Sequence, residues 1–187
     1  MEKYLPIINR IPGDKIILTG SLAVDYYSTI HNIKKLSPND IDLFVIGDKT
    51  SLEEKMNEFA ENNGFRYKGL SFWIKNKKVI DITFVDPNKA KKNERTNRSP
   101  PIFCENLGVF VENPNRLLKI YEMNKDTKER ISKKEADLLK IEILSKLIKF
   151  YPPKGGTKRK KGRMLDFEEE ETETKKPSFL ESLNSNE

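Results

Sequence analysis

Cysteine and histidine are nearly absent from this chain, with Cys104 and His31 as the single residue of each type. One cysteine cannot form an intramolecular disulfide, so a reducing compartment is expected. One histidine and one cysteine also cannot build a structural zinc site or a thiol-protease dyad with a resolving partner. Any bound metal is therefore expected to have oxygen ligands, which favours Mg²⁺ or Mn²⁺.

Long hydrophobic runs are absent as well. No apolar segment approaches the roughly 18 to 20 residues that a membrane-spanning helix needs, and residues 1–6 lack the basic and apolar blocks of a secretory signal. We expect a cytoplasmic protein with no membrane partner. The net charge of +6 includes a basic block at residues 158–163. A nuclear-import signal, an RNA-contacting arm and an unspecific charged tail remain open for that block.

Apolar and charged residues are present in nearly equal shares, 36% and 34%, as in a charge-rich globular protein. The pattern predicts an α+β fold: a small mixed sheet flanked by helices, a C-terminal helical segment, and a disordered tail. Apolar periodicity predicts strands at 15–19, 40–46, 65–68, 71–75, 79–85 and 107–111. It predicts helices at 22–30, 51–62, 113–123 and 132–152, and the proline-containing stretch 86–101 is expected to be a loop.

Local signals indicate where several helices begin. Ser51 with Glu54, and Ser132 with Glu135, have the spacing of a capping box. Pro114 suits the first turn of a helix that follows Asn113. The last helix is expected to bury an apolar stripe made of Leu138, Leu139, Ile141, Leu144, Leu147 and Ile148.

A Gly20-Ser21 turn lies between the first predicted strand and the first long helix. At such a turn, unpaired backbone N–H groups and the helix dipole attract phosphate. Glycine lets the backbone approach a ligand closely, and the Ser21 hydroxyl can donate to a phosphate oxygen. We therefore identify Gly20 and Ser21 as candidate phosphate-binding residues.

Three aspartates follow in two of the later predicted strands. Asp40 and Asp42 are one residue apart, so their side chains project to the same side of a strand and can bind one hard cation. Asp81 lies in the strand at 79–85, on the face opposite to its apolar neighbours. An acid within an apolar strand is unfavourable unless it is paired or bound to a metal. The three carboxylates are thus candidate metal ligands for chemistry at phosphorus.

This order of motifs resembles the nucleotidyltransferase superfamily typified by DNA polymerase beta. The shared pattern is Gly-Ser after the first strand, Asp-x-Asp on the second, and a lone Asp on a later strand. The sequence is closest in appearance to minimal nucleotidyltransferases and abortive-infection toxins of that superfamily. The segments 117–119 and 130–138 look similar to the helical part of those proteins.

The resemblance implies a domain organisation and a role for each motif. Residues 1–112 would be the nucleotidyltransferase catalytic domain, 113–152 a C-terminal helical segment, and 153–187 a disordered charged tail. Asp40, Asp42 and Asp81 would bind magnesium or manganese, and Asp81 would help deprotonate the acceptor hydroxyl. Gly20 and Ser21 would hold the triphosphate of ATP or another nucleoside triphosphate, with Lys119 as a further candidate ligand.

The leading hypothesis is therefore a magnesium-dependent nucleotidyltransferase with an RNA end, a protein or a small molecule as acceptor. One alternative is a catalytically weak module of the same fold that binds RNA or protein. A second is a small glycosyltransferase, which would leave Gly20-Ser21 unexplained. For Lys119, Arg95 and Arg98, a solvated surface position is an alternative to anion binding.

Overall fold

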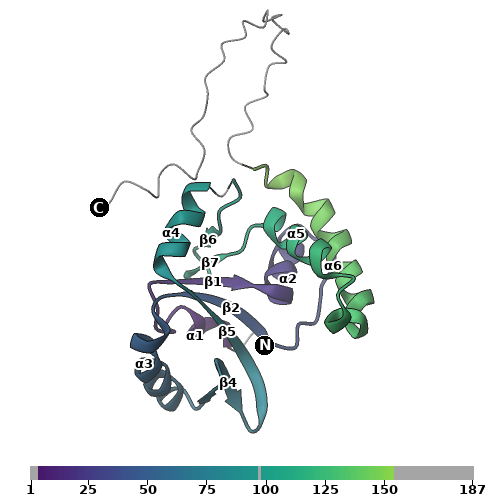
Figure 1. Cartoon of the computed structure of the whole chain (residues 1–187). Helices are drawn as coiled ribbons and strands as arrows, with labels where there is room; N and C mark the ends of the chain where they lie inside the picture. The colour runs from purple at the N-terminus through teal and green to yellow at the C-terminus, as the bar shows by residue number, and fades with distance from the viewer. Residues whose placement is uncertain (1–3, 97, 154–187) are drawn as a thin grey trace, which may run out of the picture. The chain divides into compact units, whose positions relative to one another are not determined.

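The computed structural model describes residues 4–96 and 98–153. Within those residues the chain forms a mixed seven-stranded sheet in the order β3-β4-β5-β2-β1-β7-β6 (Figure 1). The strands are β1 (Lys15–Thr19), β2 (Ile41–Ile46), β3 (Arg66–Lys68), β4 (Ser71–Ile74), β5 (Lys77–Val85), β6 (Ile102–Cys104) and β7 (Val109–Val111). The α-helices are α1 (Leu5–Ile8), α2 (Gly20–Ile30), α3 (Lys49–Asn62), α4 (Pro87–Thr96), α5 (Pro114–Asn124) and α6 (Lys134–Leu147). Two 3₁₀ helices, η2 (Lys128–Lys133) and η3 (Ile148–Phe150), flank α6.

The central strands align three polar residues in one row. β2 pairs antiparallel with β1 and parallel with β5. In this register Thr19 lies opposite Asp42, and Asp42 lies opposite Asp81. Since side chains alternate between the two faces of a sheet, paired residues such as Asp42 and Asp81 share a face. The row therefore brings the second and third predicted acids together.

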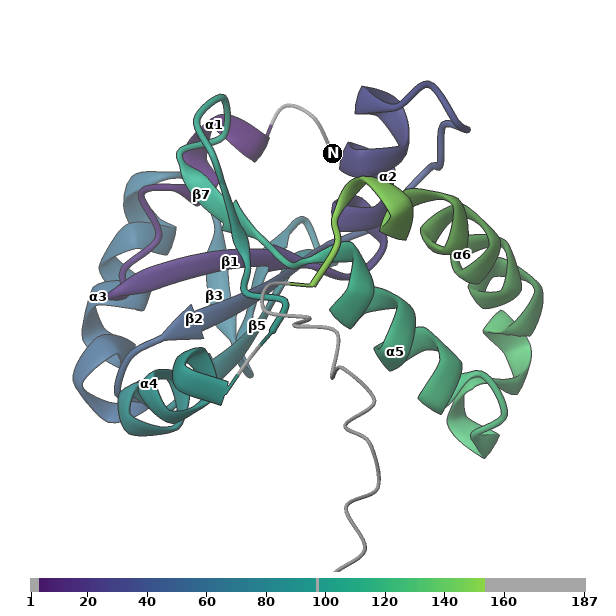
Figure 2. The same cartoon turned by 90° about the horizontal axis from the view of Figure 1, so that it is seen from above.

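The two faces of the sheet bury different residues. Ile41, Leu43 and Val45 point into the main core, with exposed fractions of 0%, 1% and 0%, as their alternation with Asp42 predicts. Helices α2, α3, α5 and α6 contribute to that core. On the acid-bearing face, Ala90 of α4 packs on a small second cluster. Figure 2 shows α4 beside β2 and β5, apart from α2, α5 and α6.

The predicted α+β class is confirmed, as is the helix that follows Asn113. The Asn113 side chain accepts a hydrogen bond from the Asn115 backbone N–H at 3.0 Å, and Pro114 occupies the first turn of α5. The sheet is nevertheless larger than the sequence predicts, because β6 at residues 102–104 was not expected. The strand predicted at 107–111 is shorter and spans Val109–Val111.

The predicted loop at 86–101 is wrong, because α4 occupies Pro87–Thr96. The Asp86 carboxylate accepts hydrogen bonds from the backbone N–H groups of Asn88 and Lys89 at 2.9 and 3.0 Å. Pro87 follows at the first helical position, where its missing N–H is not needed. The proline was thus a helix start rather than a loop signal.

Both predicted capping boxes are wrong. Helix α3 begins earlier, with Asp48 as its N-cap, and the Asp48 side chain accepts from the Ser51 backbone N–H at 2.8 Å. Helix α6 begins at Lys134 without a side-chain cap, directly after the 3₁₀ helix η2. The expected burial of Leu138 is also wrong, since this residue is 46% exposed.

Several expectations concern parts of the chain that the structure does not describe or test. The charged tail and the basic block at 158–163 lie outside the described residues. The division of the chain at residue 112 stays a prediction. Among the helices of the described residues, none is both long and apolar enough to cross a membrane.

Candidate active site

Among the acids of the sheet, Asp42 has the largest shift in pKa. Its carboxyl group is half-buried between the Gly20 turn and the neighbouring strand. Burial, and then the negative charges of Asp40 and Asp81, raise the pKa of Asp42 to about 6. The positive charges of Lys78 and Lys133 oppose this rise without cancelling it. The site therefore holds more acid than the surrounding cations neutralise.

Asp81 has two partners that the sequence did not single out. Its Oδ2 forms an ion pair with Lys78 Nζ at 2.7 Å, and its Oδ1 accepts from the Ser71 hydroxyl at 2.8 Å. Burial alone would raise the pKa of Asp81, but the hydrogen bonds from Lys78 and Ser71 outweigh it and hold the pKa below its ordinary value. Asp81 is thus kept ionised and oriented, although it is already engaged by a lysine.

Gly20 is required by the close packing of the turn against Asp42. It has a φ of +65°, and a Cβ atom at this position would lie 2.0 Å from Asp42 Oδ2. Any side chain here would displace the carboxylate as well as strain the backbone. Gly20 also begins α2, so the helix N-terminus and the Asp42 carboxylate are immediate neighbours.

Ser21 is linked to the helical segment that follows the sheet. Its hydroxyl lies close enough to the hydroxyl of Tyr121 on α5 to act on the pKa of that tyrosine. Burial raises the pKa of Tyr121 to about 12, and the nearby Ser21 hydroxyl opposes the rise. The Tyr121 hydroxyl therefore remains protonated at neutral pH and lies within reach of the phosphate-binding turn.

A cationic network lies next to Tyr121. Asp137 is fully buried, and Arg130 donates to both of its oxygens at 2.6 and 2.8 Å. Lys140 donates to Asp137 at 3.2 Å and lies 5.0 Å from the centre of the Tyr121 ring. Sequence reasoning noted the segment 130–138 but assigned no role to these residues. The spacing of Asp137 and Lys140, i and i+3 on one helix, was the available signal.

Lys119 is not brought to this site. It is an exposed residue of α5, two positions before Tyr121. Two positions correspond to about 200° around a helix, so Lys119 points away from the side that reaches Ser21. Lys133 is the lysine of the helical segment whose charge, after that of Lys78, acts on Asp42. Arg98 is exposed, and nothing is described for the side chain of Arg95.

The oxygen-rich donor set suits a hard cation, with one restriction. Asp42 and Asp81 are paired residues of adjacent strands, and no other residue separates them. The backbones of paired strands are about 5 Å apart. Within the described part of the chain, however, no group of three acidic, histidine or cysteine side chains is close enough together to hold a metal. Asp42, and Asp40 whose charge acts on it, would offer oxygen ligands to a cation, and Asp81 would join them only by exchanging Lys78.

Comparison with known proteins gives a fold. No protein-family model matches the sequence, and no curated protein matches it. Among solved structures, the Megavirus polyadenylate synthase is similar with a TM-score of 0.55 and 15% identity. The match covers 76% of this chain and 29% of the synthase, so this chain spans less than a third of that protein. An antigenic nucleotidyltransferase-like protein from Paracoccidioides brasiliensis has a TM-score of 0.47 at 12% identity, covering 71% of this chain and 68% of that one. This chain shares the fold of the polyadenylate synthase over the matched residues, in agreement with the fold that the motifs implied.

Proposed function

We propose that this protein is a magnesium-dependent nucleotidyltransferase that moves a nucleoside monophosphate from a nucleoside triphosphate to a hydroxyl acceptor. The observation that carries the proposal is the row of Asp42 and Asp81 directly beside the Gly20-Ser21 turn. Uncompensated acidity at Asp42 supports it, because a bound cation would relieve the repulsion from Asp40 and Asp81.

The triphosphate would be held where the helix and the cations meet. The backbone N–H groups at the start of α2 and the Ser21 hydroxyl would donate to phosphate oxygens. Lys133, from the helical segment, would add positive charge on the same side. Asp40, Asp42 and Asp81 would hold magnesium, which when bound neutralises the triphosphate and lowers the pKa of the acceptor hydroxyl.

The reaction would be an in-line displacement at the α-phosphorus. The acceptor oxygen forms a bond to this phosphorus while the bond to the bridging oxygen breaks, and pyrophosphate leaves. Asp81 would take the proton of the acceptor hydroxyl once Lys78 has left it, with the Ser71 hydroxyl keeping the carboxylate in place. Exchange of Lys78 away from Asp81 would therefore accompany nucleotide binding.

Transfer of labelled nucleotide provides the test. The full chain is incubated with Mg²⁺ or Mn²⁺ and each α-labelled triphosphate, using RNA, protein and the enzyme itself as acceptors. Nucleotide binding is measured by calorimetry in parallel. Asp42→Ala should abolish transfer and metal-dependent binding while the circular dichroism spectrum is retained. The proposal fails if wild type transfers nothing and binds no triphosphate.

A second candidate function is a binding module of the same fold without catalysis. The Lys78–Asp81 ion pair favours it, because a permanent internal cation would take the place of a bound metal at Asp81. In that case Lys78→Gln would create magnesium-dependent nucleotide binding that wild type lacks. For the enzyme, wild type already shows that dependence.

A further inference from the structure

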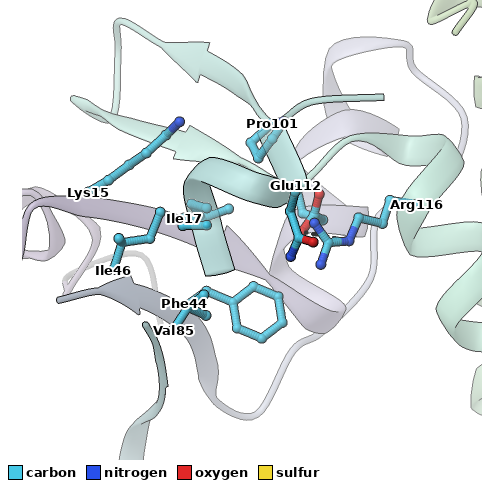
Figure 3. A pocket seen from close by; sticks show the side chains of 10 residues that line it. Lys15, Ile17, Phe44, Ile46, Val85, Pro101, Glu112 and Arg116 are labelled. Atoms are coloured by element: carbon cyan, nitrogen blue, oxygen red, sulfur yellow. Dashed lines mark ion pairs between the residues drawn. The ribbon is translucent and has the colours of Figure 1, made fainter. Parts of the chain in front are cut away.

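A cavity lies on the acid-bearing face of the sheet, next to the candidate active site. Its volume is about 50 Å³, several times the roughly 10–15 Å³ that one water requires. The floor is apolar and includes Ile17, Phe44 and Val85, while α4 and Pro101 cover it. Figure 3 shows Glu112 and Arg116 together at one end and Lys15 at the other.

The cavity continues the row of acids along the sheet. On β1 and β2, Ile17 lies opposite Phe44 and is one step along the same face from Thr19 and Asp42. Val111 of β7 is paired with Leu18, and the Glu112 backbone N–H donates to the Leu18 carbonyl at 2.8 Å. Glu112 is therefore level with Thr19 and two strand spacings, about 10 Å, from Asp42.

Glu112 is a fully buried acid with an unused oxygen. Its Oε1 accepts a hydrogen bond from the Asn113 backbone N–H at 3.2 Å. Its Oε2 is 3.6 Å from Arg116 Nε and has no hydrogen-bond partner among the residues that the structure describes. Burial raises the pKa of Glu112, against the opposing charges of Arg116 and Lys15. Because an unsatisfied buried oxygen is unfavourable, this one is suited to a donor supplied by a ligand.

We propose that this cavity, the acceptor pocket (Ile17, Phe44, Val85, Glu112 and Arg116), binds the base of an acceptor nucleoside that has an N–H group beside a carbonyl. Glu112 accepts from the N–H, and Arg116 donates to the carbonyl. Uracil and guanine have this edge, whereas adenine has no carbonyl. The assignment of the bound nucleoside as the acceptor rests on the proposed function. The contacts to the base are inferred from the pocket alone.

The lining favours a base over a simple anion. Most of the lining is apolar, and the Phe44 ring provides a surface on which a flat ring can stack. A phosphate would bring negative charge against Glu112, whose orphan oxygen can only accept. The cavity has room for the edge of a ring rather than a whole nucleotide, so the sugar would lie outside, toward Asp81.

The position favours the acceptor over the donor nucleotide. The Gly20-Ser21 turn follows the end of β1 at Thr19, whereas Ile17 of the pocket precedes that end. Along β1 and β2, Asp42 thus lies between the Gly20-Ser21 turn and the apolar floor of the pocket (Ile17 and Phe44), whereas Glu112 is level with Asp42 on the other side of β1. In-line displacement requires the attacking hydroxyl on the side opposite to the departing pyrophosphate. A nucleoside in the pocket would approach from that side.

Binding of nucleosides to the full chain, without metal or triphosphate, tests the inference by calorimetry or NMR titration. Uridine should bind at least tenfold more tightly than 3-methyluridine, in which the donor N–H is blocked. Guanosine should likewise bind more tightly than adenosine. Glu112→Gln should reduce uridine affinity at least tenfold, and the exposed-residue control Glu105→Gln should leave it unchanged. A trinucleotide ending in uridine, compared with uridine, shows whether the acceptor is a free nucleoside or a chain end.

The outcomes separate this inference from the proposed function. Equal binding of uridine and 3-methyluridine overturns the inference, and so does competition by ribose 5-phosphate as strong as that by uridine 5′-monophosphate. This comparison needs no variant, so it holds even if Glu112→Gln does not fold. Asp42-dependent transfer without nucleoside binding removes the pocket assignment and leaves the enzyme. Nucleoside binding without any transfer does the reverse.

Discussion

Two aspartates of this protein lie next to other charges, and their environments shift the pKa of the carboxyl group in opposite directions. Asp137, in the helical segment, is fully buried, yet its hydrogen bonds from Arg130 and Lys140 hold its pKa below the ordinary value against the effect of burial. Asp42, in the sheet, is only half-buried, yet its pKa is raised to about 6 because its nearest charged neighbours are also acids. The fold neutralises the acid that joins its helices and leaves under-neutralised the acid beside the phosphate-binding turn. The environment of Asp137 is that of a structural ion pair, whereas the environment of Asp42 is the one that we propose binds a cation.

The largest effect is expected from breaking the neutralised side of this comparison. Asp137→Ala would leave Arg130 and Lys140 without their buried partner and should lower the free energy of unfolding by about 3–5 kcal/mol. Because the pKa of Asp137 lies below its ordinary 3.8, the stabilisation is present above about pH 4 and is lost in stronger acid. Urea unfolding at pH 7 and pH 3 measures both. The exposed control Glu142→Ala should have no measurable effect, and equal losses would contradict the role of the network.

The under-neutralised side should respond in the opposite direction. Asp42→Asn removes a charge that the fold holds at unfavourable cost and should raise the free energy of unfolding by about 1–3 kcal/mol. The pKa in the folded state, about 6, is higher than the ordinary value of 3.8. Wild type therefore loses stability as pH rises between these values, and the gain is complete above about pH 6 and vanishes below pH 4.

Thermal unfolding of both proteins from pH 3 to pH 8, without magnesium, measures the Asp42→Asn gain. Added magnesium should stabilise wild type more than the variant. A variant that is less stable than wild type at pH 8 would show that Asp42 is paired after all.

The lysines of the helical segment test the same comparison through the affinity for nucleotide. Lys133→Gln should weaken magnesium–nucleotide binding about tenfold, or ~1.5 kcal/mol, because it removes a charged donor near the triphosphate. Lys119→Gln is the matched control and should leave the affinity unchanged, since Lys119 faces away from Ser21. Calorimetry with each triphosphate measures both. The reverse result would restore the nucleotide-binding role that the sequence suggested for Lys119.

The smallest effect is expected where the two regions meet. Tyr121→Phe removes the hydroxyl that lies near Ser21 and should lower the free energy of unfolding by about 0.5–1.5 kcal/mol. The apolar packing of the ring is retained, so the fold should be preserved. Denaturant unfolding measures the loss, and nucleotide affinity should change by less than in Lys133→Gln. A larger change in affinity than in stability would make the Tyr121 hydroxyl a ligand rather than a link.

The elements of the sheet that carry the acids could be predicted because their apolar alternation is strong. Asp42 and Asp81 each alternate with apolar residues of the opposite face, whereas the pairing of β2 with β5 was not predicted. The starts of α3 and α4 were predicted wrongly. Asp48 and Asp86 cap these helices, whereas the sequence pattern had placed the first start at Ser51 and the prolines had been interpreted as a loop signal. Lys78 and the Arg130–Asp137–Lys140 network could not be assigned, because charged residues are abundant and only tertiary packing shows which of them are buried. Glu112 offers no local signal at all.

The parallel pairing of β2 with β5 has a consequence for how the chain acquires its site. Parallel partners cannot be joined by a tight turn, and here α3, β3 and β4 all intervene between Asp42 and Asp81. Such non-local pairing forms slowly, and the repulsion between the acids does not favour it. Folding must therefore be driven by the apolar residues on the opposite face, and the carboxylates meet only as the strands dock. A chain that has folded only through β2 already holds Gly20, Ser21 and Asp42, but it lacks Asp81, which we propose as the acceptor of the hydroxyl proton. We expect chemical competence to appear as a late, all-or-none event in folding.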